Sequence, residues 1–346
     1  MPLRVGLNGA GRIGRALLRR TLRNPDVEIA GINDLAGPAT IAHLLRYDSL
    51  HGAFPCPVLP AADRIVIDGR AIPFSAEAAP ERIPWHDGVD VVVEATGRFA
   101  TADLARAHLH GSVRRVVVSA VCPGADATVV LGLHDGTVGN AAAIVSTASC
   151  TTHAAALPLA LLDEWYGVTA ADMTTVHCTT GSQVTIDAPH ADLRRARAAL
   201  VSMIPTTTSA QQGLVAALPF LDGRLACLAV RVPTATVSLV EVVAQTARPA
   251  DDVATLAERF RAAAAAPPYA GRLAASDEPL VSIDFNGNQH SSVVDLPLLA
   301  RPGRTLVRVV AWYDNEYGYA ARLAELLSHW SRGRASRGRF EMETGT

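Results

Sequence analysis

Residues 3–14 read LRVGLNGAGRIG, and this stretch decides the fold of the first half of the chain. The apolar run over residues 4–7 predicts a short buried strand, and residues 12–23 have the pattern of a helix. A second buried strand is expected over residues 27–32. Strand, glycine-rich turn, helix and strand in this order predict a βαβ unit, in which the two strands are parallel.

The three glycines of GxGxxG predict a dinucleotide site in the turn of this unit. Gly9 permits the tight turn, Gly11 lets the backbone approach a pyrophosphate, and Gly14 lets helix and strand pack closely. Free N–H groups at the helix N-terminus would face the phosphates. Asp34 ends the second strand, 20 residues after Gly14. Its carboxylate can accept hydrogen bonds from ribose hydroxyls and would repel a 2′-phosphate, which favours NAD over NADP. The alternative is a glycine-rich turn without a ligand.

The alternation of strands and helices continues through the first 150 residues. A helix is expected over residues 102–110. Further buried strands are expected over residues 89–95, 115–119, 127–131 and 143–145. This order predicts a doubly wound α/β domain with a parallel sheet. Thr96 and Gly97 follow one predicted strand and Ser119 ends another, so we expect them in the crevice where such sheets bind ligands.

Residues 146–152 read STASCTT and place Cys150 where a helix over residues 151–166 is expected to begin. The positive end of a helix dipole lowers the pKa of a thiol, and the thiolate is the nucleophile. His177 ends a predicted strand over residues 168–177 and is the candidate base for this thiol. The alternatives are an inert buried thiol and a core histidine.

The second half of the chain predicts a β-rich domain with an antiparallel or mixed sheet. Strands are expected over residues 227–232, 236–246, 280–285, 291–295 and 306–312. A helix with one buried face is expected over residues 316–330. Residues 182–205 are polar and arginine-rich and predict a long ordered loop.

Composition bounds the class of protein. The chain has 346 residues, of which 49% are hydrophobic, and its net charge is −2. No global basic field favours nucleic acid. No long apolar segment predicts a signal or a membrane span. The five cysteines include no CxxC pair, so we expect no zinc or other metal site and no disulfide framework. Free thiols favour a reducing compartment such as the cytoplasm.

Hydroxyl and arginine side chains that can bind anionic oxygens are frequent after Cys150. They are Thr151, Thr180, Arg194, Arg195, Arg197, Thr206, Thr207, Thr208 and Arg231. The alternative for the LRRAR segment is a solvated or intersubunit loop.

Several motifs together resemble the glyceraldehyde-3-phosphate dehydrogenase family over residues 3–332. They are NGAGRIGR, HLLRYDSLHG, STASCTT, MTTVH, DLRRARAA, IPTTT, RVPTATVS and WYDNEYGY, in this order. The resemblance implies an NAD-binding Rossmann domain over residues 1–149 and an α+β catalytic domain with a mixed, largely antiparallel sheet over residues 150–315. It also implies a C-terminal helix over residues 316–332 that packs on the NAD domain, a polar tail over residues 333–346, and a homotetramer.

The resemblance also implies residue roles. Cys150 would attack an aldehyde to give a thiohemiacetal, and His177 would act as acid and base. Oxidation would leave a thioester, which inorganic phosphate would release as an acyl phosphate. Residues implied in cofactor binding are Gly9, Gly11, Arg12, Ile13, Gly14, Asp34, Thr96, Gly97, Ser119, Asn315 and Tyr319. Residues implied in binding the substrate phosphate and the attacking phosphate are Ser149, Thr151, Thr180, Arg195, Thr208, Ser209 and Arg231.

The chain departs from the family pattern near the thiol and in the phosphate segments. The departures are Ala10, Val121, Cys122, Thr147, His153, Ala154, Ser182 and Ser209. His153 adds a titratable group one turn beyond Cys150, and we hypothesise that it alters the pH dependence of acylation. Alternative functions are erythrose-4-phosphate dehydrogenase, a specialised paralogue associated with arsenate or inhibitors, and a non-catalytic NAD-binding protein.

Overall fold

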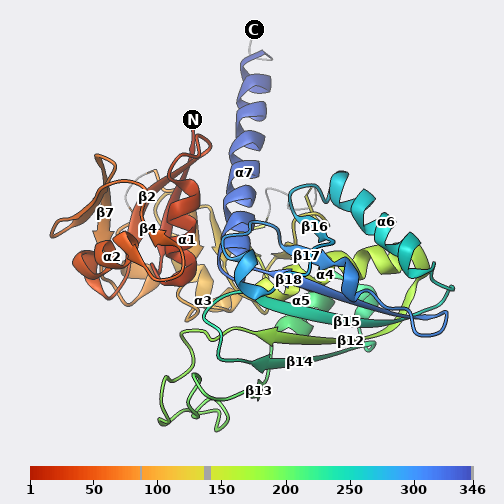
Figure 1. Ribbon diagram of the computed structural model, residues 1–346. Coiled ribbons are helices and arrows are strands. Elements are labelled where there is room, and N and C mark those ends of the chain that lie inside the picture. Colours follow the sequence, from red (N-terminus) through yellow and green to blue (C-terminus); the bar gives the residue numbers. More distant parts are fainter. Residues whose placement is uncertain (86–87, 136–141, 344–346) are drawn as a thin grey trace. The chain divides into compact units, whose positions relative to one another are not determined.

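The computed structural model describes residues 1–85, 88–135 and 142–343 (Figure 1). The chain divides into two compact units. Unit 1 takes residues 1–128, 136–147 and 320–346, and unit 2 takes residues 129–135 and 148–319. No helix among the described residues is long and apolar enough to cross a membrane.

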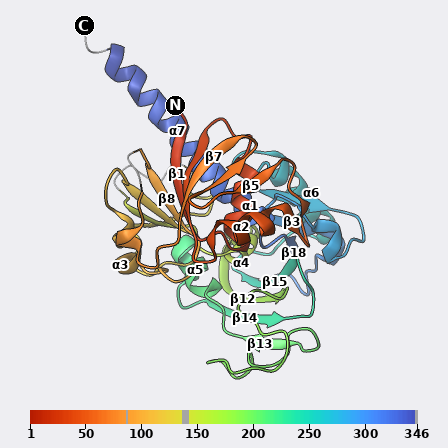
Figure 2. The same cartoon turned by 90° about the vertical axis from the view of Figure 1, so that its left-hand side faces the viewer.

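Unit 1 is built on a nine-stranded sheet with the order β10-β11-β9-β8-β1-β2-β7-β6-β5. Pairing is parallel from β10 to β7, and β6 and β5 add an antiparallel edge. The strands are β1 (Leu3–Asn8), β2 (Val27–Asn33), β5 (Val58–Pro60), β6 (Arg64–Ile67), β7 (Arg70–Ser75), β8 (Val91–Glu94), β9 (Arg115–Val118), β10 (Ala127–Thr128) and β11 (Ile144–Ser146). Figure 2 shows β1, β7 and β8 of this sheet.

Helices and short turns connect these strands. The elements are α1 (Arg12–Thr21), α2 (Gly37–Arg46), the hairpin β3 (Tyr47–Asp48) and β4 (Gly52–Ala53), the 3₁₀ turn η1 (Pro80–Arg82), α3 (Ala102–Ala105) and η2 (Arg106–His108). The predicted βαβ unit is present, with Leu3 beside Val27 and Asn8 beside Asn33. The helix expected over residues 102–110 is instead a short α-helix followed by a 3₁₀ turn.

Unit 2 contains a seven-stranded mixed sheet with the order β13-β14-β12-β15-β18-β17-β16. The strands are β12 (Val168–His177), β13 (Ile204–Thr206), β14 (Leu225–Arg231), β15 (Ser238–Thr246), β16 (Leu273–Ser276), β17 (Ser292–Asp295) and β18 (Leu306–Tyr313). Its helices are α4 (Cys150–Tyr166), α5 (Ala210–Ala217) and α6 (Val253–Ala265), with 3₁₀ turns η3 (Pro219–Leu221), η4 (Ser282–Phe285) and η5 (Leu296–Leu298). Apolar side chains of all three helices share one core with β12, β15 and β18. The predicted fold class, a parallel Rossmann sheet plus an α+β domain, is confirmed.

Two further sequence-based expectations are wrong. The strand expected over residues 280–285 is the 3₁₀ turn η4, because the Asp284 carboxylate accepts the N–H of Val281 at 2.8 Å and closes the turn. Val281 and Ile283 are exposed there, so the apolar run is not buried. The last helix, α7 (Tyr317–Glu343), continues well past residue 332. From Ala320 onward it belongs to unit 1, where Ser328 accepts a hydrogen bond from Asn24 at 2.8 Å.

Candidate active site

The glycine turn of unit 1 has the geometry that a bound pyrophosphate requires. Gly9 has a φ of +94°, a conformation that favours glycine. A Cβ on Gly14 would lie 2.1 Å from the carbonyl oxygen of Gly9, so only glycine allows this approach of helix and strand. A Cβ on Gly11 would meet nothing within 4 Å, which leaves the backbone there open to a ligand. Arg12 and Ile13 follow at the start of α1.

A cavity of about 240 Å³ lies beside this turn at the carboxyl ends of β1, β2 and β8. Asp34 lines it, and its carboxylate accepts the N–H of Ala10 at 2.8 Å. A carboxylate has about four acceptor positions, so ribose hydroxyls can still bind to it. Thr96 also lines the cavity. Gly97 follows it with a φ of +72° and is exposed. These residues fit a dinucleotide.

Two other predicted cofactor residues have structural hydrogen bonds. Ser119 follows β9, and its N–H donates to the carbonyl of Glu94 at 2.9 Å. Arg12 donates to the buried carboxylate of Asp48 at 3.0 Å. Asp48 also accepts the N–H groups of Leu50 and His51, and its pKa is lowered to about 2. Burial opposes this lowering, whereas the backbone hydrogen bonds and Arg12 cause it.

In unit 2, Cys150 is the first residue of α4, as predicted. Ser149 caps the helix, and its hydroxyl accepts the N–H of Thr152 at 3.1 Å. The preceding residue, Ala148, has a φ of +52° and is fully buried. Non-glycine residues in this left-handed region are strained by about 1–2 kcal/mol and are frequent at functional sites. The tight entry into α4 places the thiol at the first turn of the helix.

The strand register of unit 2 brings His177 and Arg231 together. They are paired residues of the parallel strands β12 and β14. His177 Nε2 lies 3.7 Å from Cys150 Sγ. On the other side of the ring, Nδ1 lies 2.8 Å from the carbonyl oxygen of Cys178 and 2.6 Å from Arg231 Nη1. A thiol, an imidazole and a guanidinium therefore lie in one continuous contact.

The electrostatics of this contact differ from the expectation for the thiol. Burial raises the pKa of Cys150 above its ordinary value, although Arg231 and hydrogen bonds from Thr151 oppose the rise. The helix terminus alone predicted a lowered pKa, and that prediction is wrong because burial of the thiol outweighs it. Burial, and then Arg231, lower the pKa of His177 to about 3. These shifts favour the neutral thiol and the neutral imidazole in the absence of substrate.

The other predicted phosphate-binding residues lie beside β13, in the segment after β12, before α5 and in the first turn of α4. Arg195 donates from Nε to Thr206 on β13 at 2.7 Å, and β13 pairs with β14 next to Arg231. The Thr208 hydroxyl accepts the N–H of Ala210 at 3.1 Å. The half-buried Thr180 has its hydroxyl oxygen 3.0 Å from the hydroxyl oxygen of Ser182. The others are Thr151, which is buried, and Ser209, which precedes α5 without a side-chain cap. The Thr151 hydroxyl lies 2.9 Å from that of Tyr313.

The two predicted cofactor residues of unit 2, Asn315 and Tyr319, are buried and hydrogen-bonded. Asn315 accepts a hydrogen bond on Oδ1 from the Cys178 thiol at 3.0 Å. Burial raises the pKa of Cys178 to about 12, so it remains a donor at neutral pH. Tyr319 donates to the carbonyl oxygen of Ala148 at 3.1 Å, and its ring packs edge-on against the buried His153.

Comparison with known proteins identifies the family. Residues 3–102 match the family described as glyceraldehyde 3-phosphate dehydrogenase, NAD binding domain, and residues 149–315 match its C-terminal domain. The chain belongs to the glyceraldehyde-3-phosphate dehydrogenase family. It is 43% identical to glyceraldehyde-3-phosphate dehydrogenase of Geobacillus stearothermophilus, covering 95% of this chain and 98% of that protein. It is 45% identical to the Kitasatospora aureofaciens enzyme of the same name, covering 94% and 98%. Unit 1 thus contains the NAD-binding domain of this family.

Sequence reasoning missed three polar residues that hold the site. Cys178 orients Asn315, and Asp48 holds Arg12. Glu94 accepts the N–H of Thr96 at 2.8 Å. The one available signal was Glu94 itself, a carboxylate that ends the apolar run VVVE and is 1% exposed. Such a carboxylate requires nearby donors.

Proposed function

We propose that this chain catalyses the NAD-dependent, phosphorylating oxidation of glyceraldehyde 3-phosphate to 1,3-bisphosphoglycerate. The observation that carries the proposal is the Cys150–His177–Arg231 contact. It occurs in a chain whose relatives are named glyceraldehyde-3-phosphate dehydrogenase. It joins a nucleophile, a proton acceptor and a cation that can bind a phosphate.

The chemistry begins at Cys150. Its Sγ would attack the aldehyde carbon while the thiol proton passes through His177 Nε2 to the carbonyl oxygen, giving a thiohemiacetal and leaving His177 neutral. His177 would then take the proton of the thiohemiacetal hydroxyl as the carbon is oxidised, leaving a thioester on Cys150. When bound, NAD supplies the hydride acceptor for this oxidation. Inorganic phosphate would attack the thioester carbonyl and expel Cys150 Sγ, which takes back the proton held by His177 as the acyl phosphate is released.

Binding of the substrate phosphate would prepare His177 for its role as a base. Arg231 only donates hydrogen bonds, so its contact at 2.6 Å favours an Nδ1 without a proton and an Nε2 that carries one. If Arg231 instead binds the phosphate, Nδ1–H can donate to the carbonyl oxygen of Cys178, already 2.8 Å away. Nε2 is then free to accept the proton of Cys150.

The direct test is NADH formation by purified protein with glyceraldehyde 3-phosphate and inorganic phosphate, compared with Cys150→Ser and His177→Asn. The proposal predicts turnover in the wild type, none above background in Cys150→Ser, and turnover reduced by about 10²–10⁴-fold in His177→Asn. Wild-type turnover in Cys150→Ser would refute the assigned nucleophile.

We further propose a cytoplasmic homotetramer. The five cysteines are free thiols, which fits a reducing compartment. Large apolar side chains are exposed along the loop before β13 and fit a subunit interface. They are Ile186, Leu193, Leu200, Val201 and Met203. Light scattering of the purified protein tests the assembly: a mass four times 36.3 kDa is expected, and a monomer would refute it.

A further inference from the structure

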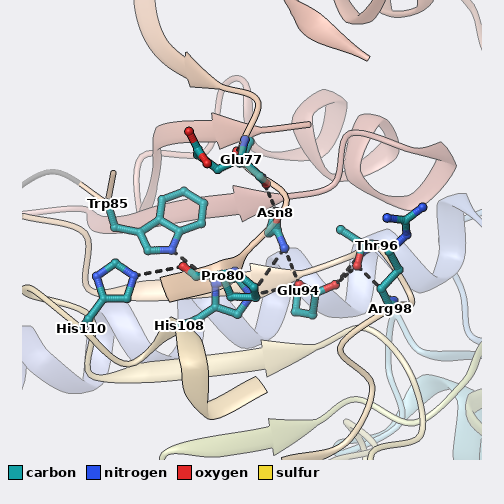
Figure 3. Close-up of polar contacts among 10 residues, drawn as sticks. Asn8, Glu77, Pro80, Trp85, Glu94, Thr96, Arg98, His108 and His110 are labelled. Carbon is teal, nitrogen blue, oxygen red and sulfur yellow. Dashed lines mark hydrogen bonds and ion pairs between the residues drawn. The ribbon is translucent and has the colours of Figure 1, made fainter. Parts of the chain in front are cut away.

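A polar cluster, buried except for Thr96, lies behind the wall of the NAD cavity, and we propose that its Glu94–His108 pair positions this wall for cofactor binding. The cluster consists of Asn8, Trp85, Glu94, Thr96 and His108 (Figure 3). Asn8 and Thr96 line the cavity. Glu94 and His108 are 1% and 0% exposed, so they can act on a ligand only through their neighbours.

Trp85 determines which nitrogen of His108 carries the proton. The indole Nε1–H can only donate, and it lies 3.3 Å from His108 Nδ1. Nδ1 must therefore accept, and the ring proton of neutral His108 is on Nε2. Nε2 lies 3.0 Å from Glu94 Oε2, so His108 donates to the carboxylate. Asn8 Nδ2 lies 3.4 Å from the same ring nitrogen, and it donates to Glu94 at 2.6 Å rather than to the ring. Any other tautomer would leave the buried indole N–H facing a second donor.

Glu94 then fixes two groups of the cavity wall. Its Oε2 accepts from Asn8 Nδ2 at 2.6 Å, as well as from His108. Its Oε1 accepts the backbone N–H of Thr96 at 2.8 Å and the Thr96 hydroxyl. The Thr96 oxygen in turn accepts the N–H of Arg98 at 3.0 Å. One carboxylate thus holds the residue at the end of β1 and the first turn after β8.

The same polarity extends to β2. Because Asn8 donates through Nδ2, its Oδ1 is the acceptor, and Asn33 Nδ2 donates to it at 2.8 Å. Asn33 Oδ1 then accepts from the Ser75 hydroxyl and from the N–H of Glu77, each at 2.8 Å. Asn33 and Glu77 also line the cavity. The donors and acceptors along this wall therefore follow in order from the Trp85 indole through His108, Glu94 and Asn8 to Asn33.

An amide in place of Glu94 would conflict with this order. Its nitrogen would place N–H groups against those of Asn8, Thr96 or His108, and a buried donor would lose its partner. The wall could recover only by reorienting Asn8 or Thr96. We therefore expect weaker NAD binding with no direct effect on Cys150, which belongs to unit 2.

The test measures the dissociation constant for NAD by calorimetry, without aldehyde, so that it is independent of turnover. Glu94→Gln and His108→Leu remove the pair from either side, and His108→Gln keeps an N–H for Glu94. Glu28→Gln is the matched control, because this carboxylate lies near the other end of β2 and pairs with Arg4 and Arg70 at 2.9 and 2.7 Å.

The proposal predicts NAD binding about tenfold weaker in Glu94→Gln and His108→Leu, the loss of about one hydrogen bond. It also predicts partial rescue in His108→Gln, wild-type affinity in Glu28→Gln, and unchanged kcat at saturating NAD. Wild-type affinity in Glu94→Gln, or equal losses in all four variants, would overturn it. If Glu94→Gln does not fold, Trp85→Phe is measured instead, because it removes only the indole N–H and part of the ring. NAD binding about threefold weaker in Trp85→Phe supports the proposal, and unchanged NAD binding overturns it.

This inference rests on the NAD site of the proposed function, but the two fail differently. A wild type that binds NAD and does not oxidise the triose phosphate would refute the proposed substrate alone. Variants that bind NAD as the wild type does would refute the positioning role alone.

Discussion

Replacing Arg231 with glutamine should shift the titrations of Cys150 and His177 in the same direction. The guanidinium lowers the pKa of both groups, and its Nη1 lies 2.6 Å from His177 Nδ1. A close charge shifts a pKa by about 1–3 units. The pKa of His177 should therefore rise from about 3 to roughly 4–6 in Arg231→Gln. The pKa of Cys150, already above its ordinary value, should rise further.

The thiol shift is measurable as a rate. A thiol with a pKa above about 9 is less than about 1% thiolate at pH 7, and the thiolate is the species that iodoacetamide alkylates. Each unit of increase in the pKa of Cys150 should slow alkylation at pH 7 about tenfold. Mass spectrometry of the Cys150 peptide separates this thiol from the other cysteines, and NMR of the His177 ring follows the imidazole.

The direction of the thiol shift separates charge from packing. If the substitution merely let water into the site, relief of burial would lower the pKa of Cys150 while raising that of His177. Loss of the cation raises both. Faster alkylation of Cys150 in Arg231→Gln would refute the electrostatic reasoning. Arg197→Gln, whose guanidinium pairs with Asp187 at 2.9 Å, should leave both titrations unchanged.

Three further predictions concern other parts of the site. The folded state keeps His177 neutral down to about pH 3, whereas the unfolded chain takes up a proton on this histidine below about pH 6.5, so His177 lowers the free energy of unfolding as pH falls through that range. In denaturant titrations, His177→Asn should reduce the slope of the free energy of unfolding against pH by about 1.4 kcal/mol per pH unit. Gly14→Ala should lower both Tm and NAD affinity, since its Cβ would meet a carbonyl oxygen at 2.1 Å, whereas Gly11→Ala should weaken NAD binding at an unchanged Tm; a matching Tm loss would contradict the open space there. Cys178→Ala should raise the KM for NAD about threefold, because the Asn315 amide loses the hydrogen bond from the thiol, and Cys178→Ser should return the KM to the wild-type value. The same KM in wild type and Cys178→Ala would show that Cys178 does not orient Asn315 for NAD.

Local signals predicted the parts of the fold that depend on neighbours in sequence. Hydrophobic periodicity and the glycine spacing predicted three features correctly. They are the glycine turn before α1, the start of α4 at Cys150 and the end of β12 at His177. The prediction of a strand over residues 280–285 was wrong, because apolar residues alone do not show that a segment is buried.

The site itself depends on long-range register and burial, which local patterns do not encode. Arg231 reaches His177 because β12 and β14 pair in parallel across more than fifty residues of chain. The raised pKa of Cys150 follows from its burial, which reasoning from a helix terminus does not measure. The Glu94–His108 contact joins the end of a strand to a 3₁₀ turn, and no sequence motif predicts it. The phosphate residues were assigned through family resemblance rather than from spacing.

The most direct test of the central claim is NADH formation from glyceraldehyde 3-phosphate with and without inorganic phosphate, compared with erythrose 4-phosphate. The account predicts rapid turnover of the triose phosphate that requires inorganic phosphate. Turnover that is independent of phosphate, preference for the tetrose, or no turnover by folded, NAD-binding protein would contradict it.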